Sequence, residues 1–249
     1  MSDTSENINV TDKAQLVDWL KSQETPKDEW RIGTEHEKFL FEKGSFRPVR
    51  YEGEAGIGEL LNRLADRHDM TPVTEKGQLI ALKDGQGGSI TLEPGGQFEL
   101  SGAPLETLHQ TCCETGRHLA QMKDITAELG LCMLGAGFQP LWSRQDISWM
   151  PKGRYKIMRE YMPKRGNLGL DMMLRSCTVQ VNLDYASEAD MVRKFRTSLA
   201  LQPVATALFA NSPFKDGQPS GVKSTRAQAW TDTDPDRGGI PPVVFADEF

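Results

Sequence analysis

The sequence predicts an α+β fold in which helices pack against a mainly antiparallel sheet. Two stretches, residues 89–101 and residues 175–185, alternate polar and apolar residues with the period of a strand. Half-buried strands of this kind are typical of antiparallel sheets. Other segments place apolar residues at helical spacing, and such amphipathic helices would give the sheet a partner to pack against.

The expected helices follow in chain order. The first begins at the cap residue Thr11, and a long one runs from about residue 104 to residue 129. The last opens at a capping box formed by Ser187 and Asp190 and continues to about residue 209, with a kink or break at Pro203. Between the first and the long helix, a further amphipathic segment carries the apolar residues Ile57, Leu60, Leu61 and Leu64.

The expected strands each carry a polar face. Residues 175–185 place one set of side chains toward the core and another on the opposite face, the latter being Thr178, Gln180, Asn182 and Asp184. In residues 89–101 a Pro-Gly-Gly bulge or turn interrupts the alternation, and Gln97 then shares a face with Glu99. In residues 33–39, Glu35 and Glu37 share a face and lie about 6–7 Å apart.

Composition bounds the class of protein. The 249 residues are 38% hydrophobic and 26% charged, which suits one large globular domain or two small ones. A formal charge of −6 argues against a broad nucleic-acid-binding surface. The first seven residues do not resemble a secretory signal, and the most apolar stretch, residues 199–209, is too short to span a membrane. We therefore expect a cytoplasmic protein without a membrane role.

The four cysteines are Cys112, Cys113, Cys132 and Cys177. They lack the C-x-x-C spacing of a structural zinc site, so we expect reduced and mostly buried thiols, with a regulatory disulfide as the minority alternative. The last residues, 241–249, are largely apolar and have no polar tail, which favours a chain cut off inside a folded domain.

Carboxylates gathered on one face of a sheet repel one another, and a cation, a proton or open water must offset this repulsion. A solvated face usually carries charges of mixed sign, whereas these faces carry acids with Gln, Asn and Thr, which favours a functional site. Mg²⁺ is commonly held by one or two carboxylates together with substrate phosphates, so ATP is the natural co-ligand. Acids in i, i+2 rows do not face each other across a cleft, which disfavours a glycosidase.

Other catalytic signatures are missing from the sequence. There is no phosphate-binding P-loop motif, no G-x-S-x-G and no H-E-x-x-H. Arg154 with Tyr155, in a glycine-containing loop, and Arg226 are candidate clamps for carboxylate or phosphate groups. The residues therefore favour phosphoryl chemistry that uses no protein nucleophile.

Four segments together resemble the plant-type glutamate–cysteine ligases, a family also found in many proteobacteria: GTEHEKF at 33–39, LEPGGQFELSG at 92–102, MPKGRY at 150–155 and WTDTD at 230–234. The resemblance extends from about residue 8 onward. It implies a glutamine-synthetase-like carboxylate–amine ligase fold, in which the sheet forms a bowl with helices on its outer face. It also implies that residues 1–249 are the N-terminal part of a single catalytic domain, incomplete at the C-terminus.

The resemblance implies a reaction as well. The γ-carboxylate of L-glutamate would be joined to the amine of L-cysteine through an acyl phosphate, giving γ-glutamylcysteine, ADP and phosphate, the first step of glutathione biosynthesis. By the resemblance, Glu35, Glu37 and Arg226 act in catalysis and Arg226 binds glutamate. The implied Mg²⁺ ligands are Glu35, Glu37, Glu93, Glu99 and Gln180.

Further substrate contacts follow from position alone. Thr178 and Asn182 share the strand face of Gln180, and Gln97 shares that of Glu99, so each is expected to touch substrate. Arg154 and Tyr155 are expected to do so from their loop. The partners are then the small molecules L-glutamate, L-cysteine and ATP, with no nucleic acid and no membrane, and a homodimer is compatible with the sequence. Two alternatives stay open: a related ligase with another amine acceptor, and a non-catalytic fragment that only binds Mg-ATP.

Overall fold

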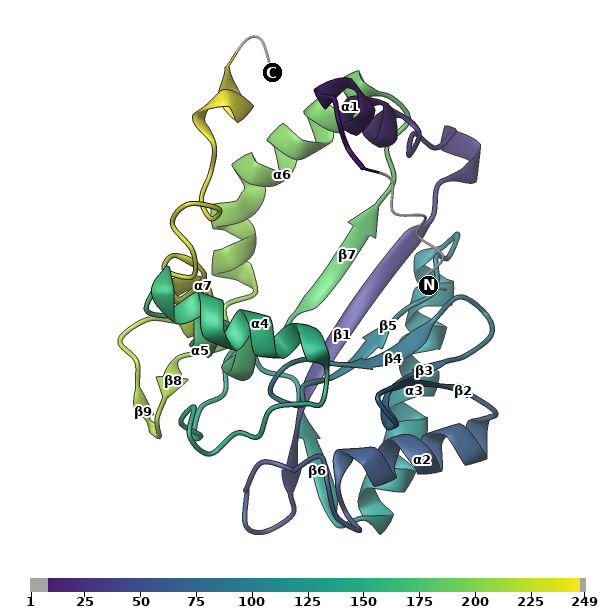
Figure 1. Ribbon diagram of the computed structural model, residues 1–249, viewed down its shortest axis with the longest axis vertical. Coiled ribbons are helices and arrows are strands. Elements are labelled where there is room, and N and C mark those ends of the chain that lie inside the picture. The colour runs from purple at the N-terminus through teal and green to yellow at the C-terminus, as the bar shows by residue number, and fades with distance from the viewer. Residues whose placement is uncertain (1–8, 247–249) are drawn as a thin grey trace.

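The computed structural model describes residues 9–246, which form a seven-stranded sheet with helices around it (Figure 1). The strands follow the order β2-β3-β4-β5-β1-β6, and β7 pairs with β1. Every pairing in this sheet is antiparallel, as predicted. The strands are β1 Ile32–Glu42, β2 Thr71–Glu75, β3 Gln78–Lys83, β4 Ser89–Leu92, β5 Phe98–Ser101, β6 Leu131–Leu134 and β7 Val179–Leu183. A separate two-stranded sheet pairs β8 Phe214–Lys215 with β9 Gln218–Pro219.

The long strand β1 organises the sheet. Its first half pairs with β5 and with β7, and its second half pairs with β6. Because side chains alternate along a strand, Glu35 and Glu37 lie on one face while His36 and Lys38 lie on the other. One face of β1 therefore contributes side chains to the main core, and the other contributes side chains to the cavity.

Helices α2 and α3 cover the face that carries His36 and Lys38. Their buried residues form the main core with the inward side chains of β3, β4 and β5, a cluster that includes Leu60, Leu61, Leu64, Leu82, Leu92, Phe98, Met122 and Ile125. Helices α5 and α7 border the opposite face, where they line a cavity with the sheet. The helices are α1 Lys13–Lys21, α2 Ile57–His68, α3 Leu108–Glu128, α4 Gly153–Tyr161, α5 Gly169–Arg175, α6 Glu188–Leu208 and α7 Thr225–Trp230.

The predicted helices are present, with corrections at their ends. Asp12 rather than Thr11 caps α1, because its side chain accepts from the Ala14 N–H. Helix α3 begins later than predicted, since Thr107 forms a capping box there. Ser187 caps α6 as predicted, but the predicted capping box does not form, because the Asp190 side chain accepts from the Ala186 N–H. The helix continues through Pro203, so the predicted break is wrong.

One predicted core face is exposed. Val179, Val181 and Leu183 of β7 are 68%, 54% and 64% exposed, whereas the alternation of residues 175–185 had placed them in the core. Within residues 9–246, no element covers this face. The alternation correctly predicted which side chains share a face, but it could not say whether that face would find a partner.

The cysteines differ in their burial. Cys177 is buried, but Cys112 and Cys113 are exposed on α3, so the expectation of mostly buried thiols is wrong for these two. All four are free thiols. In the described part of the chain, no helix combines the length and the apolar character that a membrane span requires.

Candidate active site

Four glutamates gather on the face of the sheet that α5 and α7 border. They line a cavity of about 290 Å³. The sequence had put these four acids in one site, and the structure brings all of them together. The cavity is lined by Glu35, Glu37, Glu93, Gln97, Glu99, Met172, Met173, Ser176, Thr178, Gln180, Arg226 and Trp230.

Strand pairing places three of the acids. Glu37 of β1 lies opposite Glu99 of β5, and Glu35 lies two residues along the same face. Glu93 is different, because β4 ends at Leu92 and Glu93 opens the turn that leads to β5. The Glu93 N–H donates to the Gln97 carbonyl at 3.0 Å, which closes this turn. The fourth acid thus reaches the site from a turn and not from a strand face.

Burial and mutual repulsion shift two of these carboxyl groups. The pKa of Glu37 is raised to about 8, first by burial and then by the nearby charges of Glu93 and Glu99. The pKa of Glu93 is raised to about 7 by burial and by Glu99, although Arg154 and Lys152 oppose this rise. These carboxyl groups are therefore partly protonated near neutral pH until a cation offsets their repulsion.

Side chains of β7 hold Glu35. Its Oε1 accepts from Nε2 of Gln180 at 3.0 Å and from Nδ2 of Asn182 at 3.1 Å. Next to it, the backbone N–H of Thr178 donates to Oε2 of Glu37 at 3.1 Å. The predicted residues Gln180, Asn182 and Thr178 are thus in the site, where they fix the orientation of the two β1 carboxylates.

Gln97 makes its contacts with backbone groups. It is 2% exposed, its Nε2 donates to the carbonyls of Met173 and Ser176 at 3.0 and 2.8 Å, and its Oε1 accepts from the Gly95 N–H at 2.9 Å. Both of its N–H groups are therefore occupied. The structure gives Gln97 the task of joining the 93–97 turn to the end of α5.

Arg226 provides positive charge on the other side of the cavity. Its guanidinium acts electrostatically on Glu37 and lies 5.7 Å from the Trp230 ring centre. Burial lowers the pKa of Arg226, and its buried Nε has no hydrogen-bond partner within residues 9–246. An anionic group could therefore be bound here between Arg226 and the acids.

Arg154 and Tyr155 lie in the first turn of α4 and not in the predicted loop, and they do not line the cavity. The Tyr155 hydroxyl donates to the Leu92 carbonyl at 2.5 Å, and this side chain is only 2% exposed. Arg154 stacks on the Tyr155 ring and lies 3.7 Å from the Glu93 carboxylate. The pair therefore contacts the residues on either side of the strand–turn junction, and only Arg154 reaches an acid of the site.

Several cavity residues escaped the sequence reasoning. Met172, Met173, Ser176 and Trp230 come from helices or their ends, and no local pattern distinguishes them from packing residues. Only the tertiary arrangement of α5 and α7 brings them to the acids.

The donor set fits Mg²⁺ brought in with a substrate better than a ready-made metal cage. Within residues 9–246, no three His, Cys, Asp or Glu side chains are arranged closely enough to hold a metal by themselves. Yet burial, together with repulsion from neighbouring carboxylates, raises the pKa values of Glu37 and Glu93. Mg²⁺ usually takes only one or two protein carboxylates and completes its shell with water and phosphate oxygens.

The sequence matches known proteins along most of its length. A glutamate–cysteine ligase of Medicago truncatula is 63% identical over 237 residues, which is 95% of this chain and 46% of that protein. Glutamate–cysteine ligase A of Oryza sativa subsp. japonica is 59% identical over 249 residues, covering 99% of this chain and 50% of that protein. The enzyme of Arabidopsis thaliana is 59% identical, with 99% and 47% covered.

These relatives correct one prediction. Their names all include "chloroplastic", which contradicts the expected cytoplasmic location. The prediction rested on the lack of a secretory signal, and that observation does not distinguish the cytosol from an organelle.

The comparison also shows how much of its relatives this chain covers. It spans about half the length of the curated relatives that it matches. The family described as Glutamate-cysteine ligase family 2 (GCS2) matches residues 31–249, a stretch that holds all four glutamates of the cavity. The chain belongs to this glutamate–cysteine ligase family.

Proposed function

We propose that this chain supplies the acidic part of the active site of an ATP- and Mg²⁺-dependent glutamate–cysteine ligase. The observation that carries the proposal is the pairing of Glu37 with Glu99 across β1 and β5, with Glu35 and Glu93 lining the same cavity. The names of the relatives support the choice of glutamate and cysteine as substrates.

Charge explains why the proposed reaction needs this site. The γ-carboxylate of glutamate attacks the γ-phosphorus of ATP, the bond to the bridging oxygen of ADP breaks, and an acyl phosphate forms. The cysteine amine then attacks the acyl carbon, phosphate leaves, and the nitrogen loses a proton. Because both reactants of the first step are anions, the site must offset their repulsion before they can approach.

Different residues of the chain would offset this repulsion and position the reactants. Mg²⁺, held by carboxylates among Glu35, Glu37, Glu93 and Glu99, would supply positive charge at the phosphate groups. Gln180 and Asn182 keep Glu35 in place for this task. Arg226, on the opposite side of the cavity, binds a carboxylate of glutamate.

We also propose the glutamine-synthetase-like bowl for the fold. The support is an antiparallel sheet that carries the acids on one face and packs α2 and α3 on the other. With respect to assembly, a homodimer remains a proposal that sedimentation of the complete protein would test.

The function is tested by Glu37→Gln in the protein expressed from its complete gene. We expect ADP release that requires glutamate, cysteine and Mg²⁺ together, and a loss of at least 100-fold in the variant, because a neutral amide replaces a carboxylate at the centre of the cluster. A matched control is Glu188→Gln, which removes a carboxylate at the start of α6, outside the cavity. Equal turnover by Glu37→Gln would refute the metal assignment, and faster turnover with another amine than with cysteine would refute the acceptor.

A further inference from the structure

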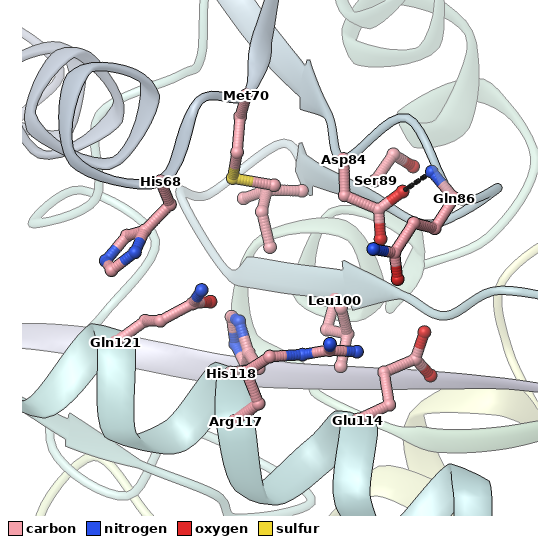
Figure 2. Close-up of a pocket in the computed structure, with 11 residues that line it drawn as sticks. His68, Met70, Asp84, Gln86, Ser89, Leu100, Glu114, Arg117, His118 and Gln121 are labelled. Carbon is pink, nitrogen blue, oxygen red and sulfur yellow. Dashed lines mark hydrogen bonds between the residues drawn. The ribbon is translucent and has the colours of Figure 1, made fainter.

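A second polar cavity lies on the opposite face of the sheet from the four glutamates. It encloses about 200 Å³ between α3, the end of α2 and the loop before β4 (Figure 2). Ile90 and Leu100 line it, and both stand in register with His36, on the face of β1 that does not carry Glu35 and Glu37. A molecule in this cavity is therefore separated from the candidate active site by the sheet.

Two buried polar side chains of α3 are directed toward this cavity (Figure 2). Glu114 and His118 are four residues apart, so they lie on one face of the helix. They are only 5% and 3% exposed. Oε1 of Glu114 accepts from the Ala103 N–H at 2.8 Å, but its Oε2 and both ring nitrogens of His118 have no partner within residues 9–246.

Such unpartnered groups are unusual in a folded protein. Most buried polar groups have a hydrogen-bond partner, and a buried donor or acceptor without one has lost its bonds to water and gained nothing in return. Burial lowers the pKa of His118 to about 3, so its ring is neutral at pH 7 and has one N–H to donate and one nitrogen to accept. Three buried polar atoms without a partner therefore belong to residues that line one wall of this cavity.

The charges around the cavity indicate the chemistry of that molecule. Asp84 and Glu114 contribute carboxylates, while Arg117 contributes a guanidinium that makes no ion pair or hydrogen bond within residues 9–246. Asp84 uses its Oδ1 to accept from the N–H groups of Gln86 and Gly88, which leaves Oδ2 available. Negative and positive groups therefore line the same small space.

We propose that this cavity binds a small zwitterion of the free α-amino acid type. Its ammonium group lies toward Asp84 and Glu114, and its carboxylate lies toward Arg117. The cavity volume equals that of about seven water molecules, which is below the range of drug-sized pockets and suits a ligand of few heavy atoms. A divalent cation alone is disfavoured, because no three acidic or histidine side chains in residues 9–246 form a metal site.

The proposal is tested by calorimetric titration of the chain with each of the twenty free L-amino acids, and with acetate, methylammonium and inorganic phosphate. We expect at least one amino acid to bind with a Kd below 10 mM and more tightly than acetate or methylammonium alone. Arg117→Gln should weaken this binding at least 10-fold. Lys123→Gln, an exposed charge removed from the same helix outside the cavity, should leave it unchanged.

A variant of Arg226 separates the two sites, because Arg226 lines the acidic cavity and does not line the second one. In this test the substitution that matters is Arg226→Gln: binding in the second cavity survives it, whereas glutamate binding in the candidate active site, where Arg226 takes the carboxylate, does not. Failure of the proposed function is thereby distinguished from failure of this proposal. Arg117 is exposed, so its variant should keep the melting temperature of the parent chain. The proposal is overturned if no amino acid binds, if Arg117→Gln binds as well as the parent, if Arg226→Gln abolishes all binding, or if phosphate binds as tightly as the best amino acid.

Discussion

Glu37 is the residue whose surroundings depart furthest from those of an ordinary surface acid. Its neighbours on the same face are other carboxylates, and its pKa is raised to about 8 by burial and by those neighbours. The sequence predicted that Glu35 and Glu37 share a face, because alternation is a local property of a strand. It could not predict the size of the repulsion, which depends on Glu99 across the sheet and on Glu93 from a turn.

The raised pKa of Glu37 predicts a pH-dependent cost in stability. The folded chain binds a proton at Glu37 up to about pH 8, whereas the unfolded chain releases it near 4.5, so the unfolding free energy falls as pH rises between these values. Each pKa unit corresponds to about 1.4 kcal/mol. In metal-free buffer, Glu37→Gln should therefore melt at the same temperature as the parent at pH 4 and several degrees above it at pH 8.5. A constant difference across this range, measured by calorimetry, would contradict the assigned shift.

Gln97 illustrates what a sequence cannot show about a single residue. Strand alternation placed it correctly beside Glu99, but its partners, the carbonyls of Met173 and Ser176, lie 76 and 79 residues further along the chain. A polar side chain near a site is easily assigned to the substrate when such distant partners are unknown. Here its amide joins two elements that both line the cavity.

Removing the Gln97 amide should destabilise the chain, because this amide joins the 93–97 turn to the end of α5. Gln97→Leu leaves two buried carbonyls and one N–H without partners, and we expect a loss of about 2–4 kcal/mol in unfolding free energy. Urea denaturation measures it. Gln180→Leu is the matched control, since its side chain is exposed and donates only to Glu35 and Asn182. Similar losses in both variants would argue against a structural role specific to Gln97.

At the scale of elements, the turn between β4 and β5 packs closely against α5. A Cβ added at Gly95 would lie 2.6 Å from the Leu174 carbonyl oxygen and 2.9 Å from Oε1 of Gln97. The first of these neighbours is backbone and cannot move alone. The Pro94-Gly95-Gly96 run in the sequence predicted a turn. Only the packing of α5 explains why Gly95 has no room for a side chain.

Gly95→Ala should consequently displace the turn that carries Glu93. We expect a melting temperature several degrees lower and Mg-ATP binding, measured by calorimetry, weaker by at least 10-fold. Gly116→Ala provides the opposite control, because its added Cβ would meet nothing within 4 Å on an exposed turn of α3. That variant should gain up to about 1 kcal/mol from helix propensity. Unchanged Mg-ATP binding in Gly95→Ala would separate the turn from the site.

The whole molecule has one face that its local patterns do not explain. Alternation explains why Glu35 and Glu37 share a face, and half-buried strands are typical of antiparallel sheets, which is why a mainly antiparallel sheet could be predicted. The order of the strands could not be predicted, because it depends on pairings between distant segments such as β1 with β5, β6 and β7. The burial of a side chain cannot be predicted from alternation, because it depends on whether another element packs against that face of the strand. β7 shows this, because its apolar side chains have the spacing of a core strand and yet lie 54–68% exposed.

This exposed face predicts self-association of the 249-residue chain. Val179, Val181 and Leu183 form an apolar row on a strand that pairs only with β1, and open strand edges with apolar side chains favour intermolecular contact. Light scattering should detect oligomers whose fraction grows with protein concentration. Val181→Thr combined with Leu183→Thr should shift the chain toward the monomer without lowering its melting temperature, because threonine keeps the strand propensity and little burial is lost. Leu108→Thr, which removes an exposed apolar residue at the start of α3, should leave association unchanged. A parent chain that remains monomeric at high concentration would contradict self-association through this face.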